Sequence, residues 1–116
     1  MSSERTYKDY LLDIADAFEK IEQFIQGMEF DEFLADDKTA FAVVRGLEII
    51  GEATKMIPDS LRQAYPTVPW KAMAGMRDKL IHHYFGVDLQ VVWETAVNDL
   101  PPLLPHIQQI LADLDT

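Results

Sequence analysis

Basic, imidazole and phenol side chains gather in one short stretch of this sequence, Arg77-Asp78-Lys79-Leu80-Ile81-His82-His83-Tyr84. An arginine can grip a phosphate through two parallel hydrogen bonds. A histidine titrates near neutral pH and can move a proton. A tyrosine can donate a hydrogen bond, stack on a base or accept a modification. These residue types suit phosphodiester chemistry, while the simpler interpretation is a polar helix end closed by Gly86.

The charge distribution places this stretch in a distinct part of the chain. The protein has 116 residues and a formal net charge of −10. Residues 1–40 carry 4 basic and 11 acidic groups, residues 41–85 carry 6 and 4, and residues 86–116 carry none and 5. Phosphate backbones are bound mainly through Lys and Arg. A polyanion therefore finds favourable charge only in the middle third, and the acidic flanks repel it and favour solubility.

Two other groups of residues contain side chains that can bind metal ions. Glu48 and Glu52 share a helix face, but no Glu-x-x-His spacing of a ferritin-like site accompanies them. At helical spacing they would instead pair with Arg45 and Lys55. The histidines are His82, His83 and His106. Adjacent histidines diverge by about 100° on a helix, and no His-x-x-x-His spacing exists, so we expect no metal and no cofactor.

Composition excludes several classes of protein. There is no cysteine, which removes disulfides, thiolate metal sites and cysteine nucleophiles. The first ten residues contain no apolar core of a signal peptide, and no apolar run approaches the roughly 20 residues of a membrane span. We expect a single domain over residues 1–116, located in the cytoplasm, with no membrane contact.

Apolar residues recur in steps of three and four throughout, which predicts an all-α bundle of four to five helices. The expected helices cover residues 7–28, 38–57, 70–84, 89–100 and 103–114. Residues 31–37 form a short acidic connection, and residues 58–69, with three prolines, form a loop with one turn near residues 59–63. Gly46 and Gly51, inside the second helix, are expected to allow close approach of another helix. Asp88 is expected to cap the helix that follows it.

The order and spacing of these residues resemble a known family. Arg77-x4-His82-x-Tyr84 matches the Arg-x4-His-x-Tyr motif of the HEPN-domain ribonucleases, specifically the HepT-like toxins. The similarity extends to residues 45–53, which look like the family's long central helix, to residues 68–82 and to the turn at residues 84–88. It covers roughly residues 7–112.

This resemblance implies a fold and a function. The family is an all-α HEPN bundle, a homodimer and a metal-independent RNA endonuclease, the toxin of a type II-like toxin–antitoxin pair. The partner is a minimal nucleotidyltransferase antitoxin that transfers AMP to the motif tyrosine. Carried over, Arg77 and His82 are the catalytic residues and Tyr84 is the AMP acceptor. DNA, which has no 2′-hydroxyl, is not expected to be cut.

Helix geometry adds a constraint on the site. Arg77 and His82 lie five residues apart, about 140° around a regular helix and ~7.5 Å along it. They therefore do not share a face, whereas Asp78 lies one turn from His82 and can orient it. A two-fold dimer that brings two such segments to one cleft would solve this, as would a distorted helix end after Leu80. The alternative function is a non-catalytic HEPN module that binds nucleotides or scaffolds a nucleotidyltransferase.

Overall fold

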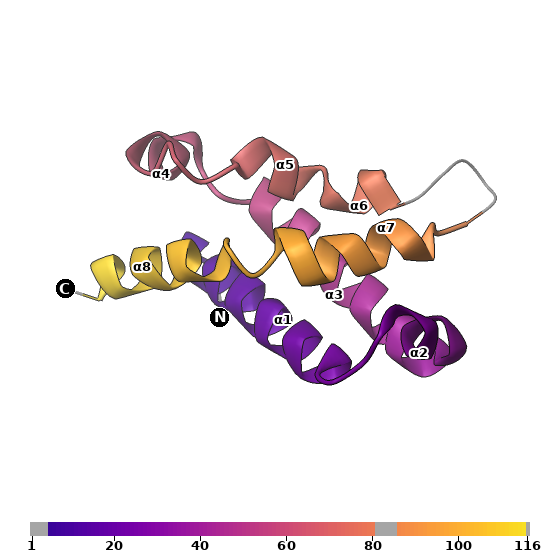
Figure 1. Cartoon of the computed structure of the whole chain (residues 1–116). Helices are drawn as coiled ribbons and strands as arrows, with labels where there is room; N and C mark the ends of the chain where they lie inside the picture. Colours follow the sequence, from indigo (N-terminus) through magenta and orange to yellow (C-terminus); the bar gives the residue numbers. More distant parts are fainter. Residues whose placement is uncertain (1–4, 81–85, 116) are drawn as a thin grey trace.

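The computed structural model describes residues 5–80 and 86–115. The regular elements of these two ranges are helices, which confirms the all-α class and the HEPN-type bundle expected from the sequence (Figure 1). They are α1 (Tyr7–Ile25), α2 (Phe30–Ala35), α3 (Asp37–Lys55), α4 (Asp59–Ala64), α5 (Trp70–Ala74), α6 (Met76–Leu80), α7 (Leu89–Glu94), a π-helix (Thr95–Asp99) and α8 (Leu104–Leu114). Among the described helices, none is long and apolar enough to cross a membrane.

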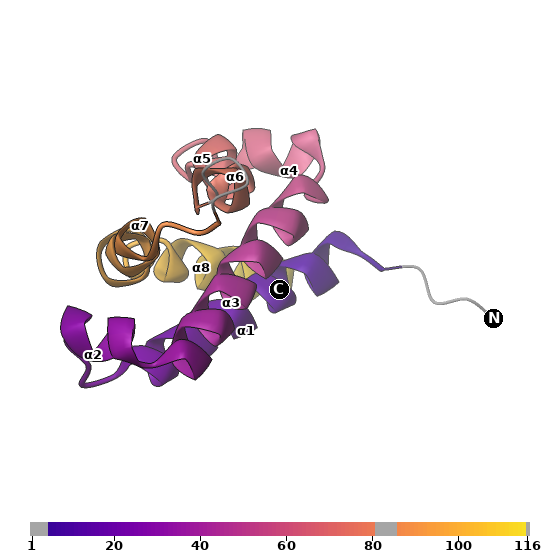
Figure 2. The same cartoon turned by 90° about the vertical axis from the view of Figure 1, so that its right-hand side faces the viewer.

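The long helices α1 and α3 form the centre of the bundle and lie side by side (Figures 1 and 2). Thr6 and Asp9 begin α1 with a reciprocal capping box, which satisfies two amide groups at the helix start. The apolar stripe of α1 is fully buried at Leu11, Ile14 and Phe18. These two helices therefore supply the scaffold on which the shorter helices pack.

Gly46 of α3 allows the close approach of another helix, α1, as the sequence predicted. A Cβ atom on Gly46 would lie 2.8 Å from the side chain of Ile21. Real Cβ atoms do not approach other heavy atoms so closely, and Ile21 is itself fully buried. The absence of a side chain at Gly46 thus sets how closely α1 and α3 pack.

The acidic connection expected at residues 31–37 is instead largely helical, as α2. Glu32 caps the start of this helix by accepting a hydrogen bond from the backbone N–H of Glu29. Phe33 is fully buried, and its ring centroid lies 5.2 Å from that of Trp93 on α7. A six-residue helix is too short to show periodicity, and this aromatic contact fixes it against α7.

The helix expected over residues 70–84 is broken in the structure. Its described part consists of α5 and α6, separated at Gly75. The N–H of Gly75 donates to the carbonyl of Lys71 and ends α5 there. Residues 81–85 lie outside the described residues. The turn expected within residues 58–69 forms the short helix α4.

The C-terminal third crosses the bundle as α7, the π-helix and α8 (Figure 1). Asp88 caps α7 as predicted, because its side chain accepts hydrogen bonds from the amides of Gln90 and Val91. The helix expected over residues 89–100 changes to π geometry at Thr95, shortly before the helix-breaking Pro101.

The last helix, α8, is tied to two distant parts of the chain. The Lys8 ammonium lies 2.6 Å from a carboxylate oxygen of Asp115. The Tyr65 hydroxyl donates to Asp113 at 2.6 Å. That hydrogen bond, more than any other interaction, holds the pKa of Asp113 below its ordinary value, and it raises the pKa of Tyr65.

Candidate active site

Helix α6 exposes Arg77 to solvent, and buried residues before and after the arginine fix the helix in place. Met76 and Leu80 are buried, and they lie four residues apart on the inner face of this short helix. Arg77 and Asp78 are exposed, and 45% of the Arg77 side chain is accessible. The arginine expected to bind phosphate is therefore available to a substrate.

The backbone of this segment lies directly on α3. A Cβ atom on Gly51 would lie 3.4 Å from the amide nitrogen of Arg77 and 3.5 Å from the carbonyl oxygen of Ala74. This confirms the expectation that Gly51 allows close approach. Because the contact is with backbone atoms, it fixes the start of α6 against α3 independently of side-chain rotamers.

One turn before Gly51, the carboxylate of Glu48 faces the Arg77 side chain. Its Oε2 lies 3.5 Å from the Nε of Arg77, and 29% of the Glu48 side chain is exposed. The sequence had suggested pairing of Glu48 along its own helix, with Arg45 or Lys55. The ion pair of Glu48 in the described part of the chain runs across elements instead, from α3 to α6.

Beyond the motif, the chain returns to the same helix α3. The N–H of Asp88 donates to the carbonyl of Leu80 at 3.0 Å, so the two described ends of the motif segment are hydrogen-bonded to each other. Gly86 has a φ of 102°, which favours glycine. Val87 then lines a small apolar hollow of about 310 Å³ with Phe41 and Val44 of α3. One side of α3 thus contacts both flanks of the motif.

Two of the predicted site residues, His82 and Tyr84, lie outside the described residues, as does the neighbouring His83. Asp78 is described and exposed, and its orientation of His82 stays a prediction. Among the residues that the structure describes, no three His, Asp or Glu side chains form a cluster suited to a metal ion.

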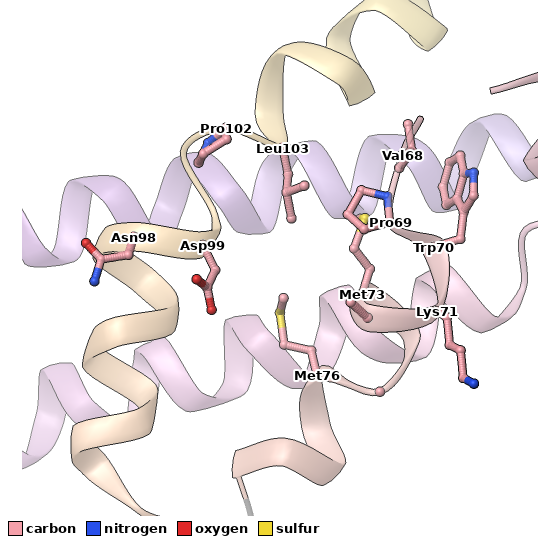
Figure 3. Close-up of a pocket in the computed structure, with 12 residues that line it drawn as sticks. Val68, Pro69, Trp70, Lys71, Met73, Met76, Asn98, Asp99, Pro102 and Leu103 are labelled. Carbon is pink, nitrogen blue, oxygen red and sulfur yellow. The ribbon is translucent and has the colours of Figure 1, made fainter. Parts of the chain in front are cut away.

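A larger groove of about 1130 Å³ lies between α5–α6 and the junction of the π-helix with α8. Figure 3 shows Met76 and Asp99 pointing into it and Lys71 pointing away. Its walls are mainly apolar, including Met73, Pro69 and Leu103. Met76 is among the described residues that line the groove, and Arg77 is not.

Comparison with known proteins identifies the family to which this chain is similar. Residues 14–110 match the family model described as Ribonuclease HepT-like. The chain is 56% identical over 106 residues to a protein of Thermococcus cleftensis named "Probable ribonuclease HepT", covering 91% of this chain and 96% of that protein. A protein of Methanocaldococcus jannaschii named as a "Putative RNase" is 46% identical, over 91% of this chain and 88% of its own length.

A third relative, from Caldanaerobacter subterraneus subsp. tengcongensis and also named as a "Putative RNase", is 43% identical over 92% of this chain and 96% of its own length. No solved structure matches the chain significantly. The chain belongs to the HepT-like ribonuclease family, which confirms the resemblance seen in the motif. Within the described part of the site, sequence reasoning missed the contact of Glu48 with Arg77, because spacing along a helix says nothing about partners on another element.

Proposed function

We propose that this chain is an endoribonuclease that cleaves RNA without a metal ion, through Arg77 and His82. The observation that carries the proposal is the setting of Arg77 in a chain of the HepT-like family. The Arg77 side chain is 45% exposed, its backbone packs on α3 at Gly51, and Oε2 of Glu48 lies 3.5 Å from its Nε. A positioned guanidinium supplies the positive charge that stabilises a phosphorane-like transition state, which is the role a metal ion plays in other nucleases.

The reaction is an in-line attack by the RNA 2′-hydroxyl on the adjacent phosphorus. The 2′-oxygen–phosphorus bond forms, the bond from phosphorus to the 5′-oxygen breaks, and the products end in a 2′,3′-cyclic phosphate and a 5′-hydroxyl. His82 transfers a proton as general base or acid. Arg77 stabilises charge on the non-bridging oxygens.

The proposed site is shared between two chains. On a regular helix Arg77 and His82 would not face one phosphate. A two-fold dimer would bring the segment of each chain to one cleft; a helix end distorted after Leu80, which would let one chain hold both groups, is the alternative. As the family resemblance implies, we further propose that the chain, as one domain over residues 1–116, is the toxin of a toxin–antitoxin pair. In that pair a minimal nucleotidyltransferase silences it by transferring AMP to Tyr84.

The direct test is incubation of the purified protein with a labelled RNA in excess EDTA, beside a DNA of the same sequence. We expect RNA fragments with a 2′,3′-cyclic phosphate end and intact DNA. Intact RNA together with retained RNA binding would instead favour the non-catalytic module. Cleavage of both nucleic acids would exclude attack by the 2′-hydroxyl.

A further inference from the structure

Glu48 is the acidic partner of Arg77, and it reaches the arginine from a different helix. The charged contact joins Oε2 of Glu48 to Nε of Arg77 at 3.5 Å. A guanidinium presents five N–H donors in a planar fork, and the two terminal nitrogens form the edge that grips a phosphate with parallel hydrogen bonds. A carboxylate on the Nε side leaves that terminal edge for a substrate.

The position of Glu48 is itself well defined. It lies in the middle of the 19-residue helix α3, next to the fully buried Leu47 and one turn before Gly51. Because Gly51 holds the backbone of α6 against α3, the separation between the two charged side chains is set by rigid elements. Groups held in this way position a side chain more precisely than groups on loops.

The contact also has an electrostatic cost for RNA binding. Glu48 adds a negative charge close to the arginine in a protein that already carries a net charge of −10. A carboxylate at this place weakens the attraction of the site for a polyanion. Removal of the Glu48 charge is therefore not expected to weaken the binding of RNA.

We propose that Glu48 is a positioning residue that holds the Arg77 guanidinium with its terminal edge toward the scissile phosphate. This rests on the proposed function, in which Arg77 contacts the phosphate. Misplacing a catalytic group by about 1 Å can cost roughly 100-fold in rate. Removal of the Glu48 charge should therefore lower kcat by about 10- to 100-fold and leave KM unchanged or lower.

The chain offers a matched control at Glu52, an exposed carboxylate one turn further along α3. Glu48→Gln and Glu52→Gln remove the same charge from the same helix. We would measure kcat and KM on a short fluorogenic RNA for both variants, for Arg77→Ala and for the double variant Glu48→Gln/Arg77→Ala. The expected loss of kcat occurs in Glu48→Gln but stays within about twofold in Glu52→Gln. The double variant should match Arg77→Ala alone, because residues that act as a unit are not additive.

A second measurement reports on the arginine without any reaction. The Nε–H signal of Arg77 in nitrogen-15 NMR is assigned by its absence in Arg77→Ala, and its heteronuclear NOE measures the order of the side chain. We expect an ordered signal in the wild type and in Glu52→Gln, and a mobile one in Glu48→Gln. Equal order in all three proteins, or an unchanged kcat in Glu48→Gln, overturns the positioning role.

The two measurements also separate this inference from the proposed function. In one outcome, the Arg77 side chain is ordered in the wild type and mobile in Glu48→Gln, but the wild type leaves RNA intact. This outcome contradicts the proposed ribonuclease and supports only the contact between Glu48 and Arg77. Cleavage by the wild type that survives Glu48→Gln at full kcat supports the ribonuclease and rejects the role of Glu48.

Discussion

Gly51 of α3 lies directly beneath Arg77 of α6: a Cβ atom on the glycine would be 3.4 Å from the arginine amide nitrogen. The neighbouring carbonyl oxygens of Ala74 and Met73 would lie at 3.5 and 3.6 Å. At these distances a methyl group would be in ordinary van der Waals contact with three backbone atoms. The side-chain size at residue 51 therefore sets how α6 and its arginine sit on the central helix.

The first prediction concerns this contact. Gly51→Ala should be tolerated, because the added methyl group would be in ordinary van der Waals contact with α5 and α6. Alanine is also about 1 kcal/mol more favourable than glycine in a helix interior. Gly51→Val should lower the free energy of unfolding by about 1–3 kcal/mol through overpacking. It should also lower RNA cleavage more than the stability loss explains. Chemical denaturation and cleavage assays on both variants test this, and equal behaviour of the two would contradict the tight contact.

The second prediction concerns the catalytic pair. Arg77→Ala and His82→Ala should each reduce RNA cleavage by about 10²–10⁴-fold, the usual effect of removing a charge-stabilising or proton-transfer group. Arg77 is exposed, so the truncation of its side chain should leave the circular dichroism spectrum unchanged. His83→Ala is the control and should retain most of the activity. Either catalytic variant keeping more than about a tenth of wild-type activity with an intact fold would refute the assignment.

The third prediction tests the shared cleft. Arg77→Ala and His82→Ala chains should each be inactive, but mixing them should form heterodimers in which one cleft receives Arg77 from one chain and His82 from the other. Cleavage should therefore return after mixing and subunit exchange. A wild-type protein that sediments as a monomer at assay concentration and still cuts RNA would show that one chain holds the whole site.

The fourth prediction places the regulatory modification. Co-expression with a cognate minimal nucleotidyltransferase should add one or more AMP units to Tyr84, detected by mass spectrometry and absent in Tyr84→Phe. The phosphodiester of the adduct would pair with Arg77 and displace the substrate phosphate. Peptide mapping of AMP to another residue, or full nuclease activity of the modified protein, would argue against this role.

The fifth prediction concerns acid stability. The hydrogen bond from Tyr65 lowers the pKa of Asp113 from its ordinary value of 3.8, and the Thr39 hydroxyl does the same for Asp36. Because these folded-state pKa values are lower than the unfolded ones, the stabilisation is present above about pH 4 and is lost as the pH falls through the folded values. Thermal melts should show Tm falling below about pH 4, and less steeply in Tyr65→Phe. The same slope in both proteins would show that this hydrogen bond does not contribute.

Residue patterns alone predicted the long helices closely. The apolar stripe that begins at Tyr7 and the apolar run of residues 38–57 correspond to α1 (Tyr7–Ile25) and α3 (Asp37–Lys55). These helices were predictable because a long helix with one buried face has apolar residues at every third or fourth position. The helix cap at Asp88 was equally predictable from the sequence, because its side chain accepts a hydrogen bond from the backbone of Gln90, only two residues away.

Features that depend on contacts between different helices could not be predicted from the sequence. The break at Gly75 and the π-helix at Thr95 occur in segments whose apolar spacing continues through them, so periodicity predicted unbroken helices. The short helix α2 is fixed by Phe33 against Trp93, 60 residues further along the chain. The Arg77–Glu48 contact likewise joins two elements, and spacing along either helix could not reveal it.

The contacts of α8 also bear on the order in which the molecule is completed during synthesis. Lys8 pairs with Asp115, 107 residues later, and Tyr65 pairs with Asp113, 48 residues later. A chain emerging from the ribosome can pair α1 with α3 early, because both are made in its first half. The contacts of Asp113 and Asp115 cannot form before these residues have been synthesised, and closing so long a loop carries a larger entropic cost than local pairing. Arg77 and the part of α3 on which it packs are thus synthesised before Asp113 and Asp115, which tie the C-terminal segment to Tyr65 and Lys8.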